Sequence, residues 1–153
     1  MWTGGVRVIV LDDKDRMLLV KQSHKERDVW MCPGGGIEEG EFAIDTARRE
    51  MKEETGLDIV NCRMICHIQE VSERGQRFVN LFMADMADPN VKVELGYDPE
   101  FNNDEQVLSD IRFMSREEMQ DLEALYPLYI RETFWEEYYA GKLDHDAFRK
   151  REE

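Results

Sequence analysis

The segment that most constrains the fold lies between residues 42 and 55, because it combines a helical period with a defined end. Its apolar residues Ile44, Ala47 and Met51 fall together on a helical wheel of about 100° per residue. Gly56 follows at the position where a glycine commonly closes a helix. The sequence therefore predicts one amphipathic helix here, preceded closely by three consecutive glycines.

Short strand-like segments lie on both sides of this helix, since they are rich in apolar and β-branched residues. The candidate strands are residues 6–11, 17–21, 64–71, 78–84, 91–95 and 107–114. We expect the first two to pair as a hairpin through a turn at 12–15, and residues 22–29 and 96–106 to form polar loops. This order predicts an α+β domain rather than a regular βαβ repeat.

The last forty or so residues have a helical character. Ser115 to Glu118 fits a capping box that opens a helix. The helical spacing of Tyr126, Ile130, Phe134 and Tyr138 predicts a longer helix after it. The charged tail from Leu143 suggests a last short helix. We expect this stripe to pack on its own domain, with a dimer face or a substrate lid as alternatives.

The composition restricts the partners of the protein. The chain has 153 residues and a formal net charge of −14, which disfavours long nucleic acids and anionic membranes. We see no signal peptide and no apolar stretch of the roughly 18 residues that a membrane helix needs, so a cytoplasmic location is expected. The three cysteines are predicted to be reduced thiols, with a zinc site at Cys62, Cys66 and His67 as the alternative.

Four charged residues share one arc of the predicted helix: Arg49, Glu50, Glu53 and Glu54. Carboxylates spaced three and four residues apart repel one another, and a hard divalent cation can turn this repulsion into coordination. An arginine can hold a carboxylate by two hydrogen bonds, and a glycine run lets the backbone approach a metal or phosphate. Taken alone, an acidic helix face is usually a solvated surface.

The spacing between the glycines and the helix is more specific. Five residues separate Gly35 from Glu41, and seven more lead to Arg49-Glu50-Met51. One further residue leads to Glu53-Glu54, and another to Gly56-Leu57. This pattern resembles the Nudix box without a departure at any defined position, and the preceding segment 30–35 is similar to the approach to that box.

The resemblance implies a Nudix-type α/β/α sandwich with a mixed β-sheet. It implies one domain over 1–153, with a core at about 4–115 and a helical extension at about 116–153. The implied activity is hydrolysis of a diphosphate linkage in a nucleoside diphosphate joined to another moiety, with Mg²⁺ or Mn²⁺ as cofactor. The expected partner is therefore a small nucleotide-type substrate, and the protein is expected to be a monomer or a homodimer.

The resemblance also assigns roles to single residues. Glu50, Glu53, Glu54 and the carbonyl of Gly34 are the expected metal ligands, while Gly34, Gly35 and Gly36 form the loop at the metal and diphosphate. Arg49 is expected to orient the carboxylates, and Glu41 to support the start of the helix. The general base remains open between Glu50, Glu53 and Glu105 of a later loop, with Asp104 as an alternative to Glu105.

Two other functions remain to be weighed. One is an isomerase or glycosylase on the same fold, and the other is a sensor domain that binds a nucleotide without cleaving it. The complete set of box acids argues against both. No signature after the box identifies the substrate, and no proline lies about fifteen residues beyond it.

Overall fold

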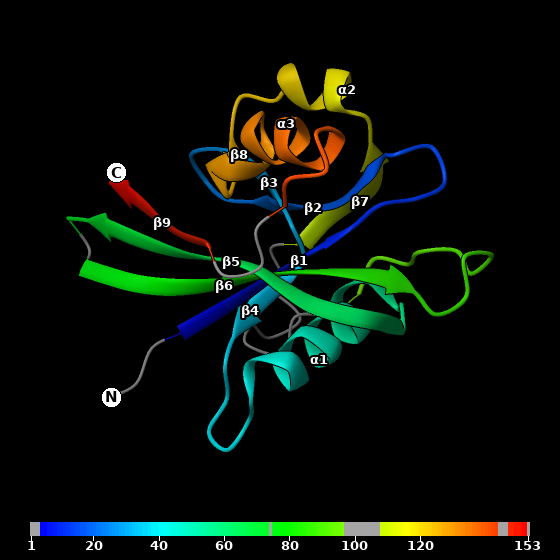
Figure 1. The fold of residues 1–153 in the computed structure, drawn as a ribbon, viewed down its shortest axis with the longest axis horizontal. Helices are drawn as coiled ribbons and strands as arrows, with labels where there is room; N and C mark the ends of the chain where they lie inside the picture. Colours follow the sequence, from blue (N-terminus) through cyan, green and yellow to red (C-terminus); the bar gives the residue numbers. More distant parts are fainter. Residues whose placement is uncertain (1–3, 74, 97–107, 144–146, 153) are drawn as a thin grey trace.

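The computed structural model describes residues 4–73, 75–96, 108–143 and 147–152. Two sheets are stacked between helices (Figure 1). The five-stranded sheet has the order β4-β1-β6-β5-β9, and the four-stranded sheet has the order β7-β2-β3-β8. Parallel and antiparallel pairs occur in both sheets, so the predicted mixed α/β/α sandwich is confirmed.

The bounds of the strands and helices are as follows. The five-stranded sheet contains β1 (Gly4–Val10), β4 (Gly34–Gly36), β5 (Ile59–Ser72), β6 (Gly75–Met86) and β9 (Ala147–Glu152). The four-stranded sheet contains β2 (Met17–Ser23), β3 (Asp28–Met31), β7 (Leu108–Met114) and β8 (Leu125–Tyr126). The helices are α1 (Ala43–Thr55), α2 (Arg116–Gln120), the 3₁₀ helix η1 (Leu128–Ile130) and α3 (Thr133–Tyr139).

Helix α1 forms where the sequence predicts it. Ala47 and Met51 are fully buried and pack in one core cluster with valines of β1, while α1 lies below the five-stranded sheet in Figure 1. Phe42 precedes the helix in an extended conformation, and its N–H donates to the side chain of Asp45 at 3.3 Å. Gly56 closes it with a φ of 75°, where its N–H donates to the carbonyl of Lys52. These ends fix the register of the glutamates.

The predicted hairpin between residues 6–11 and 17–21 is wrong. Strands β1 and β2 belong to different sheets, and they meet at one isolated bridge between Leu11 and Met17. Strand β1 pairs with β4 and β6, whereas β2 pairs with β3 and β7. Both strands are buried on both faces, and such strands take long-range partners that a local pattern does not specify.

Two other segments also differ from the predictions. The expected loop at 22–29 contains the end of β2 and the start of β3. Residues 91–95 form no strand. They lie instead against the end of α1, where Glu94 donates its N–H to Thr55 and Gly96 donates its N–H to Glu54. The polar loop predicted at 96–106 lies almost entirely outside the described residues.

The C-terminal region contains strands as well as helices. The helix predicted over 126–139 is interrupted at Pro127, which has no N–H to donate and separates β8 from η1 and α3. The helix predicted in the tail is instead β9, which pairs in parallel with the otherwise open edge of β5. The capping box of Ser115 and Glu118 is confirmed at the start of α2.

The aromatic stripe packs inside its own chain, as predicted. Phe134 and Trp135 of α3 are fully buried against residues of both sheets, and α2 and α3 lie above the four-stranded sheet in Figure 1. The three cysteines are free thiols. Burial raises the pKa of Cys32 to about 12 and that of Cys66 to about 11, so these sulfur atoms stay protonated. None of the described helices is long and apolar enough to cross a membrane.

Candidate active site

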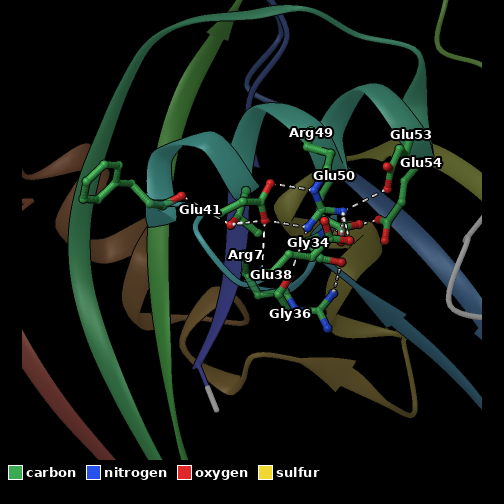
Figure 2. A network of polar contacts seen from close by, with 11 residues as sticks. Arg7, Gly34, Gly36, Glu38, Glu41, Arg49, Glu50, Glu53 and Glu54 are labelled. Atoms are coloured by element: carbon green, nitrogen blue, oxygen red, sulfur yellow. Dashed lines mark hydrogen bonds and ion pairs between the residues drawn. The ribbon is translucent and has the colours of Figure 1, made fainter. Parts of the chain in front are cut away.

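Arg49 lies at the centre of a group of glutamates at the junction of α1 and β4 (Figure 2). Its Nε and Nη2 donate to the two oxygens of Glu41, at 2.8 and 2.9 Å. Its Nη1 donates to Glu50 Oε1 at 3.0 Å and to Glu53 Oε2 at 3.2 Å. Its Nη2 also donates to the carbonyl of Gly36 at 3.1 Å. One guanidinium therefore fixes three carboxylates and the glycine strand relative to one another.

Glu41 joins the loop before the helix to the helix itself. Besides Arg49, its carboxylate accepts hydrogen bonds from the Thr46 hydroxyl and from the N–H of Glu38, each at 3.0 Å. The hydrogen bond from Arg49 lowers the pKa of Glu41 to about 2, so this side chain is ionised at neutral pH. These contacts are consistent with the supporting role expected of Glu41.

Glu50 and Glu54 are almost fully buried against the glycines of β4. Their residues are 4% and 2% exposed, which sets them apart from an ordinary solvated acidic face. Glu54 Oε2 accepts a hydrogen bond from the N–H of Gly34 at 3.2 Å. A Cβ atom at Gly35 would lie 2.3 Å from Glu50 Oε1. The glycines thus allow the carboxylates to approach the backbone closely.

Gly34 also lies close to the backbone of β1. A Cβ atom at Gly34 would lie 1.9 Å from the carbonyl oxygen of Val6, so this position excludes any side chain. Arg7 Nη1 donates to the carbonyl of Gly34 at 3.4 Å and to the carbonyl of Cys32 at 3.0 Å. Arg7 was not predicted as a site residue, although it is a lone basic residue within the apolar run Val6–Leu11.

The donor atoms around β4 fit a hard divalent cation by their chemistry. Carboxylate and backbone carbonyl oxygens are the ligands that Mg²⁺ and Mn²⁺ prefer. Among the described residues, no group of three or more His, Cys, Asp or Glu side chains is arranged to hold a metal ion. Arg49 Nη1 instead contacts one oxygen of Glu50 and one of Glu53. The alternative zinc site at Cys62, Cys66 and His67 is likewise not formed.

Two residues considered as the general base cannot be placed. Glu105 and Asp104 lie outside the described residues, so the assignment of either one stays a prediction. The described chain before them, up to Gly96, is held at the C-terminal end of α1 by hydrogen bonds to Glu54 and Thr55. A Cβ atom at Gly96 would lie 1.6 Å from the carbonyl oxygen of Glu53, so the segment passes directly along the glutamate helix.

Similar sequences include named pyrophosphohydrolases. The chain is 41% identical over 64 residues to the RNA pyrophosphohydrolase of Bartonella bacilliformis, a match to 37% of this chain and 38% of that protein. It is 29% identical over 129 residues to the ADP-ribose pyrophosphatase of Bacillus subtilis, covering 82% of this chain and 70% of the relative. The first curated relatives are matched over 36–40% of their own length.

Solved structures share the fold over nearly the whole chain. A NUDIX hydrolase from Nitrosomonas europaea superposes with a TM-score of 0.70 at 21% identity, covering 95% of this chain and 93% of that one. The NUDIX domain of Shewanella oneidensis NrtR, solved with ADP ribose, gives a TM-score of 0.71 at 18% identity, covering 90% and 89%. The family model described as NUDIX domain matches residues 1–133. With the box residues gathered on α1 and β4, this match shows that the chain belongs to the NUDIX family.

Proposed function

We propose that this protein is a pyrophosphohydrolase that cleaves the diphosphate linkage of a nucleoside diphosphate joined to another moiety. The observation that carries the proposal is the burial of Glu50 and Glu54 beside Gly34 and Gly35, with Arg49 holding Glu50 and Glu53. Carboxylate oxygens gathered beside a backbone carbonyl are the donor set that a hard divalent cation prefers. Relatives named as an RNA pyrophosphohydrolase and an ADP-ribose pyrophosphatase support the same reaction class.

Glu50, Glu53, Glu54 and the Gly34 carbonyl would hold Mg²⁺, with Mn²⁺ as an alternative. When bound, such an ion polarises phosphoryl oxygens, lowers the pKa of a coordinated water and stabilises the leaving oxygen. It also offsets locally the net charge of −14, which otherwise repels an anionic substrate. The complete acidic set favours turnover over nucleotide binding alone.

The chain's own residues have three tasks in this reaction. Arg49 restrains the rotamers of the carboxylates, and Glu41 holds Arg49 by two hydrogen bonds. Gly35 and Gly36 of β4 leave the backbone accessible at the place where the diphosphate would lie. A carboxylate of Glu50, Glu53 or Glu105 accepts the proton of the attacking water.

Replacing a ligand by its amide tests the proposal most directly. Glu53→Gln and Glu54→Gln each keep the side-chain volume but remove a negative charge, and we expect turnover to fall by more than about a hundredfold. Released phosphate or monophosphate would be measured with a panel of nucleoside triphosphates, nucleotide sugars and dinucleotides, in Mg²⁺ and in EDTA. Glu136→Gln on α3, an exposed glutamate far along the chain, is the matched charge control.

The outcomes separate the proposal from its rivals. Hydrolysis of a panel member by the unaltered protein, lost in EDTA and in both variants, supports it. Activity that survives both substitutions would show that the ligand assignment is wrong. Binding of a nucleotide without any hydrolysis across the panel would identify a sensor domain instead.

A further inference from the structure

A cavity of about 650 Å³ is bordered by strands of both sheets and by the segment that contains η1. Its charged lining consists of Arg7, Arg27, Arg77, Arg131, Glu70 and Glu123. Four arginines against two glutamates make this cavity cationic, although the protein as a whole carries a net charge of −14. A local charge of the opposite sign concentrates anions at one place on an acidic molecule.

Arg7 connects this cavity to the glutamates of α1. It lines the cavity, and its Nη1 donates to the carbonyl of Gly34 at 3.4 Å. The N–H of the same glycine donates to Glu54 at 3.2 Å. Gly34 therefore contacts both the cavity-lining Arg7 and the glutamate helix.

Arg77 of β6 is held in place by two hydrogen bonds. Its Nε donates to Glu70 Oε2 at 2.6 Å, and its Nη2 donates to the Tyr126 hydroxyl at 3.1 Å. Glu70 is 3% exposed, so its carboxylate is a fixed anchor, while the Arg77 side chain remains 53% exposed. Within the described residues, Nη1 of Arg77 makes no hydrogen bond and is available to an anion.

The ring of Tyr126 contacts a second arginine as well. The guanidinium carbons of Arg7 and Arg77 each lie 5.4 Å from the centre of its ring. Arg131 contributes charge rather than free donors, because it binds the carbonyls of Met119, Gln120 and Leu122 at the end of α2. Arg7, Arg77 and the exposed Arg27 are thus the residues that can bind a ligand directly.

We propose that this cavity binds a phosphate group outside the diphosphate linkage that is cleaved, with Arg77 as the specificity-determining residue. This inference rests on the proposed function, and it narrows the substrate to nucleotides with an additional phosphate, such as nucleoside triphosphates. Guanidinium groups bind phosphate through paired, charge-assisted hydrogen bonds. A neutral sugar would displace water from these arginines without supplying the opposite charge.

Substrate pairs that share a nucleotide portion test this preference. ATP and ADP-ribose both contain ADP, while NADP⁺ differs from NAD⁺ by one phosphate. We expect kcat/KM to be at least about tenfold higher for the more phosphorylated member of one or both pairs, since one charge-assisted hydrogen bond is worth that much. Arg77→Gln should abolish this preference, mainly by raising KM for the more phosphorylated member of each pair. Arg77→Lys should restore part of the preference.

The matched control is Arg112→Gln on β7. Arg112 is exposed to a similar extent and has one ion pair, with Asp110, but it does not line the cavity. It should leave the substrate ratio unchanged. An Arg77→Gln variant that slows both members of each pair equally would overturn the inference, as would a preference for the neutral member.

Binding of inorganic tripolyphosphate in EDTA keeps this test independent of turnover. Calorimetry should show binding to the unaltered protein and to Arg112→Gln, weakened about tenfold or more in Arg77→Gln. Thermal unfolding would establish that each variant is folded. Equal affinity in all three proteins, or no binding, would contradict the cavity assignment. A protein that binds tripolyphosphate but hydrolyses nothing would refute the proposed function alone.

Discussion

The glutamate face of α1, which consists of Glu50, Glu53 and Glu54, and the arginine cavity have opposite charges. Their residues also come from the sequence in different ways. The first comes from one continuous stretch, residues 34–54, in which Arg49 of α1 donates hydrogen bonds to Glu41, Glu50 and Glu53. The second joins Arg7 of β1, Arg77 of β6 and Tyr126 of β8, which are far apart in the sequence. The proposed site of hydrolysis is thus encoded locally, whereas the proposed selectivity depends on the tertiary fold.

Gly34 is the point where the two regions touch, so a side chain there should disrupt both. In Gly34→Ala the new Cβ atom would lie 1.9 Å from the backbone oxygen of Val6, and a backbone atom of a buried strand cannot move aside easily. We expect a loss of about 3 kcal/mol or more in the free energy of unfolding. Urea denaturation measures it.

A matched glycine provides the control for that experiment. Gly40→Ala also places a side chain at a positive φ, of 84°, but no atom lies within 4 Å of its Cβ. It should cost about 1 kcal/mol, from backbone strain alone. Equal losses in the two variants would show that close packing at Gly34 is unimportant.

A side chain at Gly35 should disturb the glutamate face alone and leave the arginine cavity intact. In Gly35→Ala the Cβ atom meets the carboxylate of Glu50 at 2.3 Å, and a carboxylate at the end of a flexible side chain can move. We expect little change in stability but a loss of about a hundredfold in kcat, because Glu50 leaves its position beside β4. Tripolyphosphate binding in EDTA should be unchanged. Weakened binding there would mean that the two regions are not separable.

The same contrast explains what the sequence could predict. The period of Ile44, Ala47 and Met51 and the closing Gly56 specify α1, because helical contacts are local. The spacing from Gly35 to Glu54 likewise identified residues that the structure brings together. Strand pairing is not local, so β1 and β2 were wrongly joined, and β9 was expected to be a helix. The contact between Arg77 and Tyr126 has no sequence signal, since it exists only after both sheets have formed.

The electrostatics of the glutamate face can be tested through pH. Arg49 lowers the pKa of Glu41 to about 2 from its ordinary value near 4.5. A carboxyl with a depressed pKa contributes stability that is fully present above about pH 4.5 and is lost as the pH falls towards 2. Glu41→Gln lacks this contribution, so its melting temperature should lie below that of the unaltered protein at pH 6 by a few degrees.

The difference in melting temperature should then shrink steadily as the pH falls from 4.5 towards 2, because protonation of Glu41 removes the charge that the variant lacks at every pH. Glu39→Gln serves as the control, because Glu39 is exposed in the same loop and makes no hydrogen bond or ion pair with the described residues. It should match the unaltered protein at every pH. A difference for Glu41→Gln that stays constant down to pH 2 would show that Glu41 acts through packing. In that event packing, and not the charge of Glu41, would hold Arg49 in place. The contrast in charge between the two regions would then not explain the arrangement of the glutamates.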